Sequence, residues 1–414
     1  MTFDHTRRAC YTGYVTQAIV NNLAPLLFIV FQTRYSISYE MLGRLILLNF
    51  ATQLLTDFVA MNVVDRIGYR VPLVLAHALC TIGLVLLAVL PSTIATPYLG
   101  LCVAIVIYAI GGGLLEVLVS PVVEALPTPQ EGKAAAMSLL HSFYCWGQVL
   151  VVVGTTLLLA QIGHQAWQVL PVIWALVPLV NLFIFLKVPM PPTVAEEHRT
   201  TLAKLFTIPT FGIALVLMLC AGASELTMSQ WSSLFAEQGL NVPKVWGDLA
   251  GPCLFAVLMG IGRIVYGLWG EKIPLVSAII GCGTLATVCY LIAVFSHHPI
   301  WGLVGCATCG LAVSLLWPGT FSLAAARFPL GGAAMFGLLA LFGDAGAAIG
   351  PWLAGAVADV TTRNQGESGG LMQWLSSVSG AGLRSGLLVG IIFPIGVVVT
   401  ALAYQLISPN KSSS

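Results

Sequence analysis

Charged side chains are scarce in this 414-residue chain, because Asp, Glu, Lys and Arg together make up only 8% of it. Soluble domains average about 25% charged residues, so this chain has too few charges to cover a surface exposed to water. Hydrophobic residues make up 58% of the chain. The composition therefore excludes a soluble protein and predicts an integral membrane protein. The formal net charge of +1 indicates no polybasic face, so we do not expect nucleic acid as a partner.

Several motifs that carry chemistry are also missing. The sequence has no phosphate loop of the GxxxxGKS or GxxxxGKT type, no HExxH motif and no paired CxxC zinc site, so neither ATP hydrolysis nor metal catalysis is indicated. The ten cysteines fall within or beside apolar segments, where we interpret them as small buried hydrophobic side chains. Ser142 follows His141 directly, and adjacent helical residues do not face each other. We expect no enzyme activity, no cofactor and no metal.

Long apolar segments recur along the whole chain. Lipid offers no hydrogen-bond partner to an open backbone, so such segments cross a membrane as helices, each of about 20 residues. The sequence predicts an all-α integral membrane protein with twelve transmembrane helices, over residues 11–33, 43–64, 70–90, 97–125, 134–160, 166–187, 209–235, 247–269, 274–295, 300–326, 333–360 and 383–407.

A polar connection over 188–208 divides the predicted helices into six and six. The run Arg70-Val71-Pro72-Leu73-Val74 matches Lys272-Ile273-Pro274-Leu275-Val276 at a spacing of 202 residues. Similar sequences at the same loop of both halves indicate a duplicated six-helix unit. We expect an N-terminal six-helix bundle over 1–187, a cytoplasmic linker over 188–208 and a C-terminal six-helix bundle over 209–414.

Lysine and arginine are unevenly distributed between the two sides of the predicted membrane protein. Most of them fall in loops on the same side as the N-terminus. Positively charged loops stay in the cytoplasm, so we expect both termini to be cytoplasmic, in a multi-pass protein of the plasma membrane, here the bacterial inner membrane.

The loop after the second predicted helix reads Val64-Asp65-Arg66-Ile67-Gly68-Tyr69-Arg70. It resembles the signature loop of the major facilitator superfamily, Gly-x-x-x-Asp-Arg-x-Gly-Arg-Arg, with Met61 at the leading glycine position and Tyr69 at a basic one. The twelve helices, the linker and the repeat fit the same superfamily. The resemblance implies alternating access, in which two bundles rock around a midplane site that the first, fourth, seventh and tenth helices line.

Shorter motifs are similar to those of the fucose/glucose permease branch of that superfamily. They are Leu140-His141-Ser142-Phe143, Ala223-Ser224-Glu225 and Gly343-Asp344. This resemblance implies proton-coupled sugar uptake, with a glutamate of the fourth helix as the protonation site.

Acidic side chains inside predicted helices are candidates for ion coupling, because an unpaired ionisable group costs several kcal/mol in a membrane. Glu116, Ser120 and Glu124 are spaced at i, i+4 and i+8 and so share one helix face. Burial disfavours a charged carboxylate, and histidine titrates near neutral pH. We therefore predict Glu116, His141 and Glu225 as proton-coupling residues. The alternative for Glu116 is a permanent structural hydrogen bond to a neighbouring helix.

Amide and hydroxyl groups inside the predicted helices supply the donors and acceptors that a hydroxyl-rich solute needs. Interhelical amide packing is the alternative for Asn22. For Trp231 the first interpretation is a place in the membrane-interface belt, and the second is stacking against an apolar sugar face or a ligand ring. Pro25, one turn after Asn22, frees a backbone carbonyl and allows a bend in the first helix. The predicted substrate-binding residues are Gln17, Asn21, Asn22, Glu116, Tyr144, Gln148, Glu225, Ser229, Trp231 and Trp317.

A third group of charged residues lies nearer the predicted cytoplasmic side. Arg263 is the only cation that we expect within a span, and Asp344 is its leading partner. Such an ion pair could open and close with the access state; the alternative is a static pair that fixes helix packing. The predicted gating residues are Asp57, Asp65, Arg66, Arg70, Arg263 and Asp344.

The sequence thus predicts a secondary active transporter that imports a small polar solute, such as a sugar or a sugar-like polyol, together with a proton. One alternative is a proton-coupled exporter or antiporter of an amphipathic compound, and another is an uncoupled facilitator or sensor. The expected partners are the small-molecule substrate, protons (with sodium as the other candidate ion) and the lipid bilayer. We expect a monomer.

Overall fold

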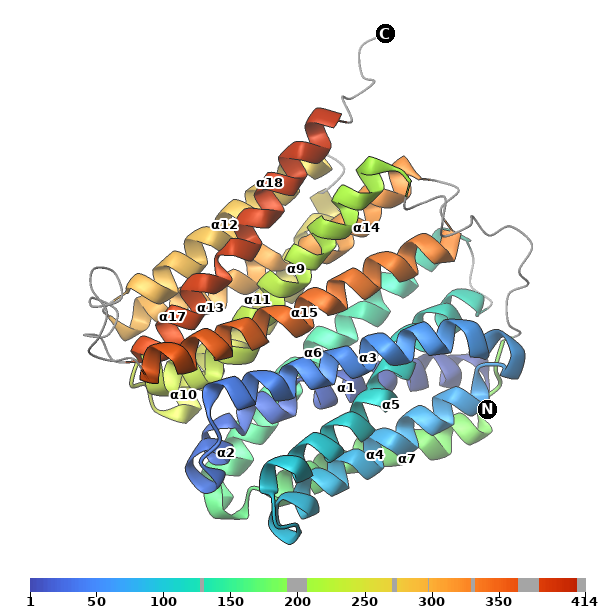
Figure 1. The fold of residues 1–414 in the computed structure, drawn as a ribbon. Helices are drawn as coiled ribbons and strands as arrows, with labels where there is room; N and C mark the ends of the chain where they lie inside the picture. Colours follow the sequence, from blue (N-terminus) through green and yellow to red (C-terminus); the bar gives the residue numbers. More distant parts are fainter. Residues whose placement is uncertain are drawn as a thin grey trace. The chain divides into compact units, whose positions relative to one another are not determined.

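The computed structural model describes residues 1–126, 130–191, 207–269, 274–296, 298–328, 332–363 and 380–407. Every regular element in this part of the chain is helical (Figure 1). The chain forms two compact units. The first contains Met1–Ser38 and Leu48–Ala195, and the second contains Tyr39–Leu47 and Glu196–Ser414.

The first unit is a bundle of long helices. Its first spanning segment is broken, because α1 and α2 are bent by 43° at a break that directly follows Pro25 and Leu26. A proline removes one backbone hydrogen bond and kinks a helix, and the bend that Pro25 allows is present here. The elements are α1 (Phe3–Leu26), α2 (Phe28–Tyr35), α3 (Tyr39–Ile67), α4 (Arg70–Thr93), α5 (Pro97–Ala125), α6 (Gln130–Ile162), the short turn η1 (His164–Ala166) and α7 (Val169–Lys187).

Side-chain contacts at both ends of this bundle define which helix ends lie together. At one end, Thr6 near the start of α1 donates a hydrogen bond to the carbonyl of Pro189, just after α7 (2.6 Å). At the other end, Gln168 before α7 donates to Ser92 at the end of α4 (3.2 Å). Gly68 joins α3 to α4 with φ of +75°, a conformation that side chains with a Cβ rarely adopt.

The second unit repeats the long-helix pattern but contains two π-helical turns. The elements are α9 (Pro209–Leu234), the π turn η2 (Phe235–Gly239), α10 (Lys244–Asp248), the π turn η3 (Leu249–Cys253), α11 (Leu254–Trp269), α12 (Leu275–Phe295), α13 (Pro299–Val313), α14 (Leu316–Arg327), α15 (Gly332–Arg363), α17 (Ala381–Gly390) and α18 (Ile392–Ile407). Prolines begin α9 and α13, where the missing N–H would have no partner within the helix.

Glycines bring α9 and α15 into close contact. A Cβ added to Gly222 would lie 2.1 Å from the carbonyl oxygen of Gly343, and one added to Gly346 would lie 2.0 Å from that of Leu219. Neither helix leaves room for a side chain at these points. Small residues at helix crossings are typical of membrane bundles, where packing supplies much of the association energy.

The first residues of α3 pack within the second unit. The backbone N–H of Tyr39 donates to Asp359 (2.9 Å), and its hydroxyl donates to Gln238 (2.6 Å). A Cβ added to Gly43 would lie 3.1 Å from the Cα of Trp352. The helix that begins at Tyr39 therefore belongs to the second unit at its start and to the first unit from Leu48 onward.

Eleven described helices are long and apolar enough to span a membrane, or twelve if α1 and α2 together form one span. Large apolar side chains such as Leu176, Phe183, Ile264 and Val399 are exposed, as expected for groups that face lipid. The all-α membrane fold predicted from the sequence is confirmed. Most of the predicted linker lies outside the described residues.

Candidate functional site

Gln17 on α1 connects an acidic side chain to an amide in the core of the first unit. Its Nε2 donates to Oε2 of Glu116 on α5 and to Oε1 of Gln53 on α3, both at 2.9 Å. Gln17 is 2% exposed and Gln53 is fully buried. The hydrogen bond from Gln17 turns the Glu116 side chain toward α1.

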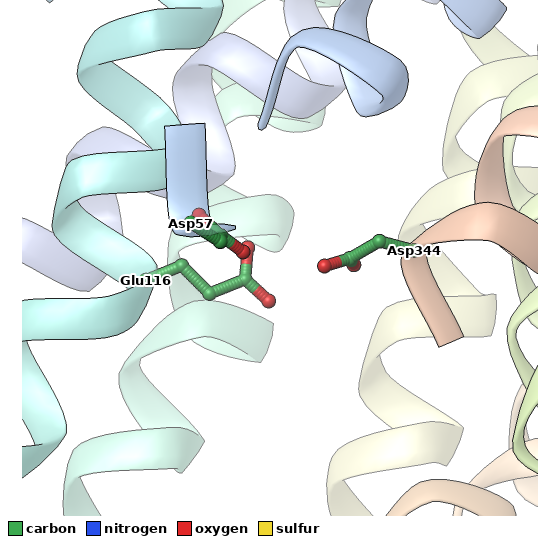
Figure 2. A group of neighbouring side chains, drawn as sticks. All are labelled: Asp57, Glu116 and Asp344. Carbon is green, nitrogen blue, oxygen red and sulfur yellow. The ribbon is translucent and has the colours of Figure 1, made fainter. Parts of the chain in front are cut away.

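Asp57 on α3 lies beside Glu116. Figure 2 shows the two carboxyl groups turned toward each other, and oxygen atoms of the two lie within 4.8 Å. Asp57 is 4% exposed. Two carboxylates at this separation repel each other when both are ionised, so the pair is suited to hold a proton. Asp344, also drawn in Figure 2, lies on α15 in the second unit.

The hydrogen bonds continue from Gln53 toward the start of α3. Nε2 of Gln53 donates to Oδ1 of Asn21 (2.7 Å), and Nδ2 of Asn49 donates to the same oxygen (3.1 Å). We name the four residues Gln17, Gln53, Asn21 and Asn49 the amide ladder. All four are at most 5% exposed.

Sequence reasoning missed two members of the ladder, Gln53 and Asn49. The signal was present, because Asn49, Gln53 and Asp57 follow one another at i, i+4 and i+8 and therefore share a helix face. This polar stripe faces Gln17 and Asn21, which are also four residues apart.

Two glycines of α5 leave room for the ladder and for Asp57. A Cβ added to Gly112 would lie 3.1 Å from Oε1 of Gln17, and one added to Gly113 would lie 2.8 Å from Oδ1 of Asp57. Both positions are one turn before Glu116. The helix that supplies the carboxyl group thus has no side chains where the polar groups of α1 and α3 approach it.

The remaining predicted site residues of the first unit lie around this core. Asn22 is turned away from the ladder, because its Nδ2 donates to the carbonyl of Ala18 in the same helix (2.9 Å). Ser120 shares a hydrogen bond with the hydroxyl of Tyr14 (3.0 Å), and the Tyr14 ring lies 5.1 Å from the exposed ring of His141. Glu116 and Ser120 therefore both face α1. The pairing of Glu116 with His141 stays a prediction.

Two predicted binding residues on α6, Tyr144 and Gln148, lie one turn apart on the helix that packs on α1. Tyr144 is partly exposed and Gln148 is buried. Their assignment to substrate binding stays a prediction.

Glu225 is one of the buried acidic residues of the second unit. It lies on α9 and is 7% exposed. The guanidinium of Arg263, on α11, donates to the carbonyl of Ser314 (3.4 Å). The proton-coupling and binding roles of Glu225 and the gating role of Arg263 stay predictions. The predicted pair of Arg263 with Asp344 stays a prediction.

Trp231 corrects one sequence interpretation. Its side chain is 1% exposed, and its Nε1 donates to the carbonyl of Pro351 (2.9 Å). The interpretation that Trp231 sits in a membrane-interface belt is wrong, because a belt tryptophan turns its polar edge to water and not to a neighbouring helix. Ser229 is buried nearby on α9, while Trp317 on α14 is partly exposed.

Arg384 corrects a second interpretation, that Arg263 is the only cation within a span. Arg384 lies on α17, inside the span Ala381–Ile407, and is 3% exposed. Its guanidinium donates to the carbonyl of Ser296 (2.9 Å) and to that of Val294. These carbonyls end α12 without a partner in their own helix, so Arg384 closes a helix end.

Arg70, predicted as a gating residue, makes the equivalent kind of contact in the first unit. Its guanidinium donates to the carbonyls of Leu186 (2.6 Å) and Val188 (2.8 Å) at the end of α7. The side chains of Asp65, Arg66 and Glu124 lie outside the described residues. The gating role of Asp65 and Arg66 therefore stays a prediction.

Comparisons with known proteins agree with this architecture. The family model of the Major Facilitator Superfamily matches residues 10–351. No curated protein matches the sequence significantly. Among solved structures, a bacterial homologue of the human lysosomal transporter Spinster is 16% identical with a TM-score of 0.76, covering 97% of this chain and 96% of its own.

Two sugar symporters are also similar in fold. A D-xylose–proton symporter is 15% identical with a TM-score of 0.76, over 100% of this chain and 99% of its own. The fucose:proton symporter of E. coli is 16% identical with a TM-score of 0.64, over 98% and 99%. The family model covers most of the chain, and its members are transporters. This chain belongs to the Major Facilitator Superfamily.

Proposed function

We propose that this protein is a secondary active transporter that carries a small polar solute, a sugar or sugar-like polyol, across the membrane together with a proton, by alternating access. The observation that carries the proposal is the pair of Glu116, which is partly buried, and Asp57, which is buried, with Glu116 held by Gln17. A carboxyl pair inside a membrane bundle can take up and release a proton without a metal or a cofactor.

The polar groups next to the pair favour a hydroxylated solute. Primary amides offer both donors and acceptors, and the ladder concentrates four of them in the first unit. The xylose and fucose symporters similar in fold are named for sugars and protons, which supports the same solute class and the same ion. We propose the bacterial inner membrane as the location, with both termini in the cytoplasm and a monomer as the working form.

The first experiment identifies the solute. Selective binding stabilises a folded protein by mass action, so a thermal-shift screen of purified protein against sugars, polyols, nucleosides and drugs, with and without sodium, should give shifts among the sugars and polyols. Shifts confined to amphipathic drugs would contradict the proposal and favour the alternative, a proton-coupled exporter or antiporter of an amphipathic compound. If the shifts require sodium, the coupling ion is sodium and not the proton.

The second experiment tests the proton site with Glu116→Gln in proteoliposomes. The amide keeps the size of the side chain but cannot bind or release a proton. We expect accumulation of the solute against its gradient to be lost, whereas exchange of labelled for unlabelled solute continues. Ser142→Ala, at a hydroxyl that donates to the carbonyl of Leu139 in its own helix, is the matched control. Accumulation by Glu116→Gln at the wild-type level would refute the role of Glu116.

A further inference from the structure

The amide ladder leaves one buried acceptor without a donor at each of its ends. Among the described residues, neither Oε1 of Gln17 nor Oδ1 of Asn49 has a hydrogen-bond partner. A buried polar atom without a partner costs about 1–3 kcal/mol, so such atoms are rare in native proteins. Here they occur at the first and the last residue of one continuous chain of hydrogen bonds.

The direction of the hydrogen bonds explains this pattern. An ionised carboxylate can only accept, so Gln17 must turn its NH2 group toward Glu116. Its second N–H goes to Gln53, which must then present oxygen to Gln17 and NH2 to Asn21. The carbonyl oxygens of the two end residues, Gln17 and Asn49, therefore have no donor among the described residues.

A Glu116 protonated on Oε2, the oxygen that Gln17 binds, requires the opposite direction. Its O–H needs an acceptor, and Oε1 of Gln17 reaches it if the side-chain amide turns by half a rotation. The same turn at Gln53, Asn21 and Asn49 restores every hydrogen bond between the same partners, with donor and acceptor exchanged. Asn49 then presents Nδ2 in the place of Oδ1.

We propose that the amide ladder transmits the protonation state of Glu116 to Asn49 by reversing the direction of its hydrogen bonds. This inference rests on the proposed function, and it adds Gln53 and Asn49 as positioning residues for coupling. With Glu116 ionised, the unused group at the Asn49 end is an acceptor. With Glu116 protonated it is a donor, so a solute hydroxyl meets a different partner in each state.

Other titratable side chains on the helices around Glu116 take no part in the hydrogen bonds of the amide ladder. Asp57 on α3 lies beside Glu116, and its charge affects the pH at which Glu116 binds a proton. Tyr14 of α1 is bonded to Ser120 on the side toward His141 of α6. On α4, His77 is bonded to the carbonyl of Leu73 and to Asn181 of α7.

The test is infrared difference spectroscopy of reconstituted protein between acidic and alkaline medium, with isotope-labelled asparagine. In the wild type we expect a carboxyl band that disappears in Glu116→Gln, together with a shift of the labelled asparagine amide band. Gln53→Met keeps the size of the side chain but removes both donor and acceptor. It should retain the Glu116 band and lose the asparagine shift.

Two further variants complete the experiment. Gln168→Met makes the same replacement at the exposed outer end of α7 and should keep both signals. Asn49→Leu should keep the Glu116 band but lose the pH dependence of binding for a monosaccharide set containing D-xylose and L-fucose. A coupling of about 5- to 150-fold between two binding events is typical, and we expect the wild-type pH effect on sugar affinity to fall in that range.

The outcomes separate the two proposals. An asparagine shift that persists in Gln53→Met, or that is absent from the wild type while the Glu116 band is present, overturns the ladder and leaves the proton site standing. A wild type without any band that depends on Glu116 overturns the proposed function itself.

Discussion

At the scale of single residues, two arginines in this membrane protein donate hydrogen bonds to the carbonyls at helix ends. Arg70 binds the last carbonyls of α7, and Arg384 binds those of α12. The planar guanidinium presents several N–H groups in a fixed fork, which suits a cluster of converging carbonyls. Arg70 lies at the start of α4 and Arg384 near the start of α17. Each arginine therefore stabilises the end of a different helix.

Arg70→Lys should lower stability although it keeps the charge. Lysine presents a compact ammonium that cannot reach all the carbonyls that Arg70 binds at once. Hydrogen bonds to charged groups contribute about 1.5–3 kcal/mol each, and we expect a loss of that order, seen as a lower midpoint of thermal unfolding in detergent. Arg7→Lys, at an exposed ion pair with Asp4, is the control and should change the midpoint little. Equal midpoints for the two variants would argue against the role of Arg70.

At the scale of elements, glycines decide which helices touch. Gly346 and Gly350 recur along one side of α15, where an added Cβ would meet Leu219, Ala223 or Thr227 of α9. Their spacing keeps them on neighbouring positions of one helix face. The backbones can approach there because no side chain separates them.

Gly346→Ala should therefore destabilise the second unit. The added methyl group would lie 2.0 Å from the carbonyl of Leu219, so α9 and α15 must move apart. Overpacking of this kind typically costs about 1–3 kcal/mol, measurable as a lower unfolding midpoint. Gly281→Ala is the matched control, since nothing lies within 4 Å of the added atom and alanine is the better helix former. If Gly346→Ala were as stable as Gly281→Ala, the close contact would not exist.

At the scale of the whole molecule, the apolar periodicity predicted the helices closely. The predicted helix over 70–90 is Arg70–Thr93 in the structure, and the one over 97–125 is Pro97–Ala125. The lipid solvent makes this possible, because a spanning backbone must satisfy its hydrogen bonds within the helix. Turn residues such as Gly68 and breakers such as Pro25 then fix where a helix ends or bends.

The site was harder to predict than the fold. Glu116 and Gln17 were identified as polar residues inside the membrane, but their direct hydrogen bond depends on the rotation of α1 and α5 about their axes, which no single-helix pattern specifies. The rotation of α9 about its own axis likewise turns Trp231 inward. The partners of Asn21 are not evident from the sequence, because Asn49 and Gln53 lie within a predicted apolar span and their shared face becomes informative only against a second helix.

Membrane orientation provides a prediction for the whole chain. The bias of Lys and Arg predicts that both termini are cytoplasmic. Epitope tags fused before Met1 and after Ser414 should therefore be protected from protease in intact cells and cleaved after the membrane is permeabilised. Cleavage of either tag in intact cells would contradict this topology.

The hydrogen bonds of Tyr39 have a consequence for the start of α3. Its backbone N–H donates to Asp359 and its hydroxyl donates to Gln238, both within the second unit. Tyr39→Phe removes the second of these bonds and keeps the ring. The first turn of the helix should then open more often, and faster hydrogen exchange of its backbone amides would report it.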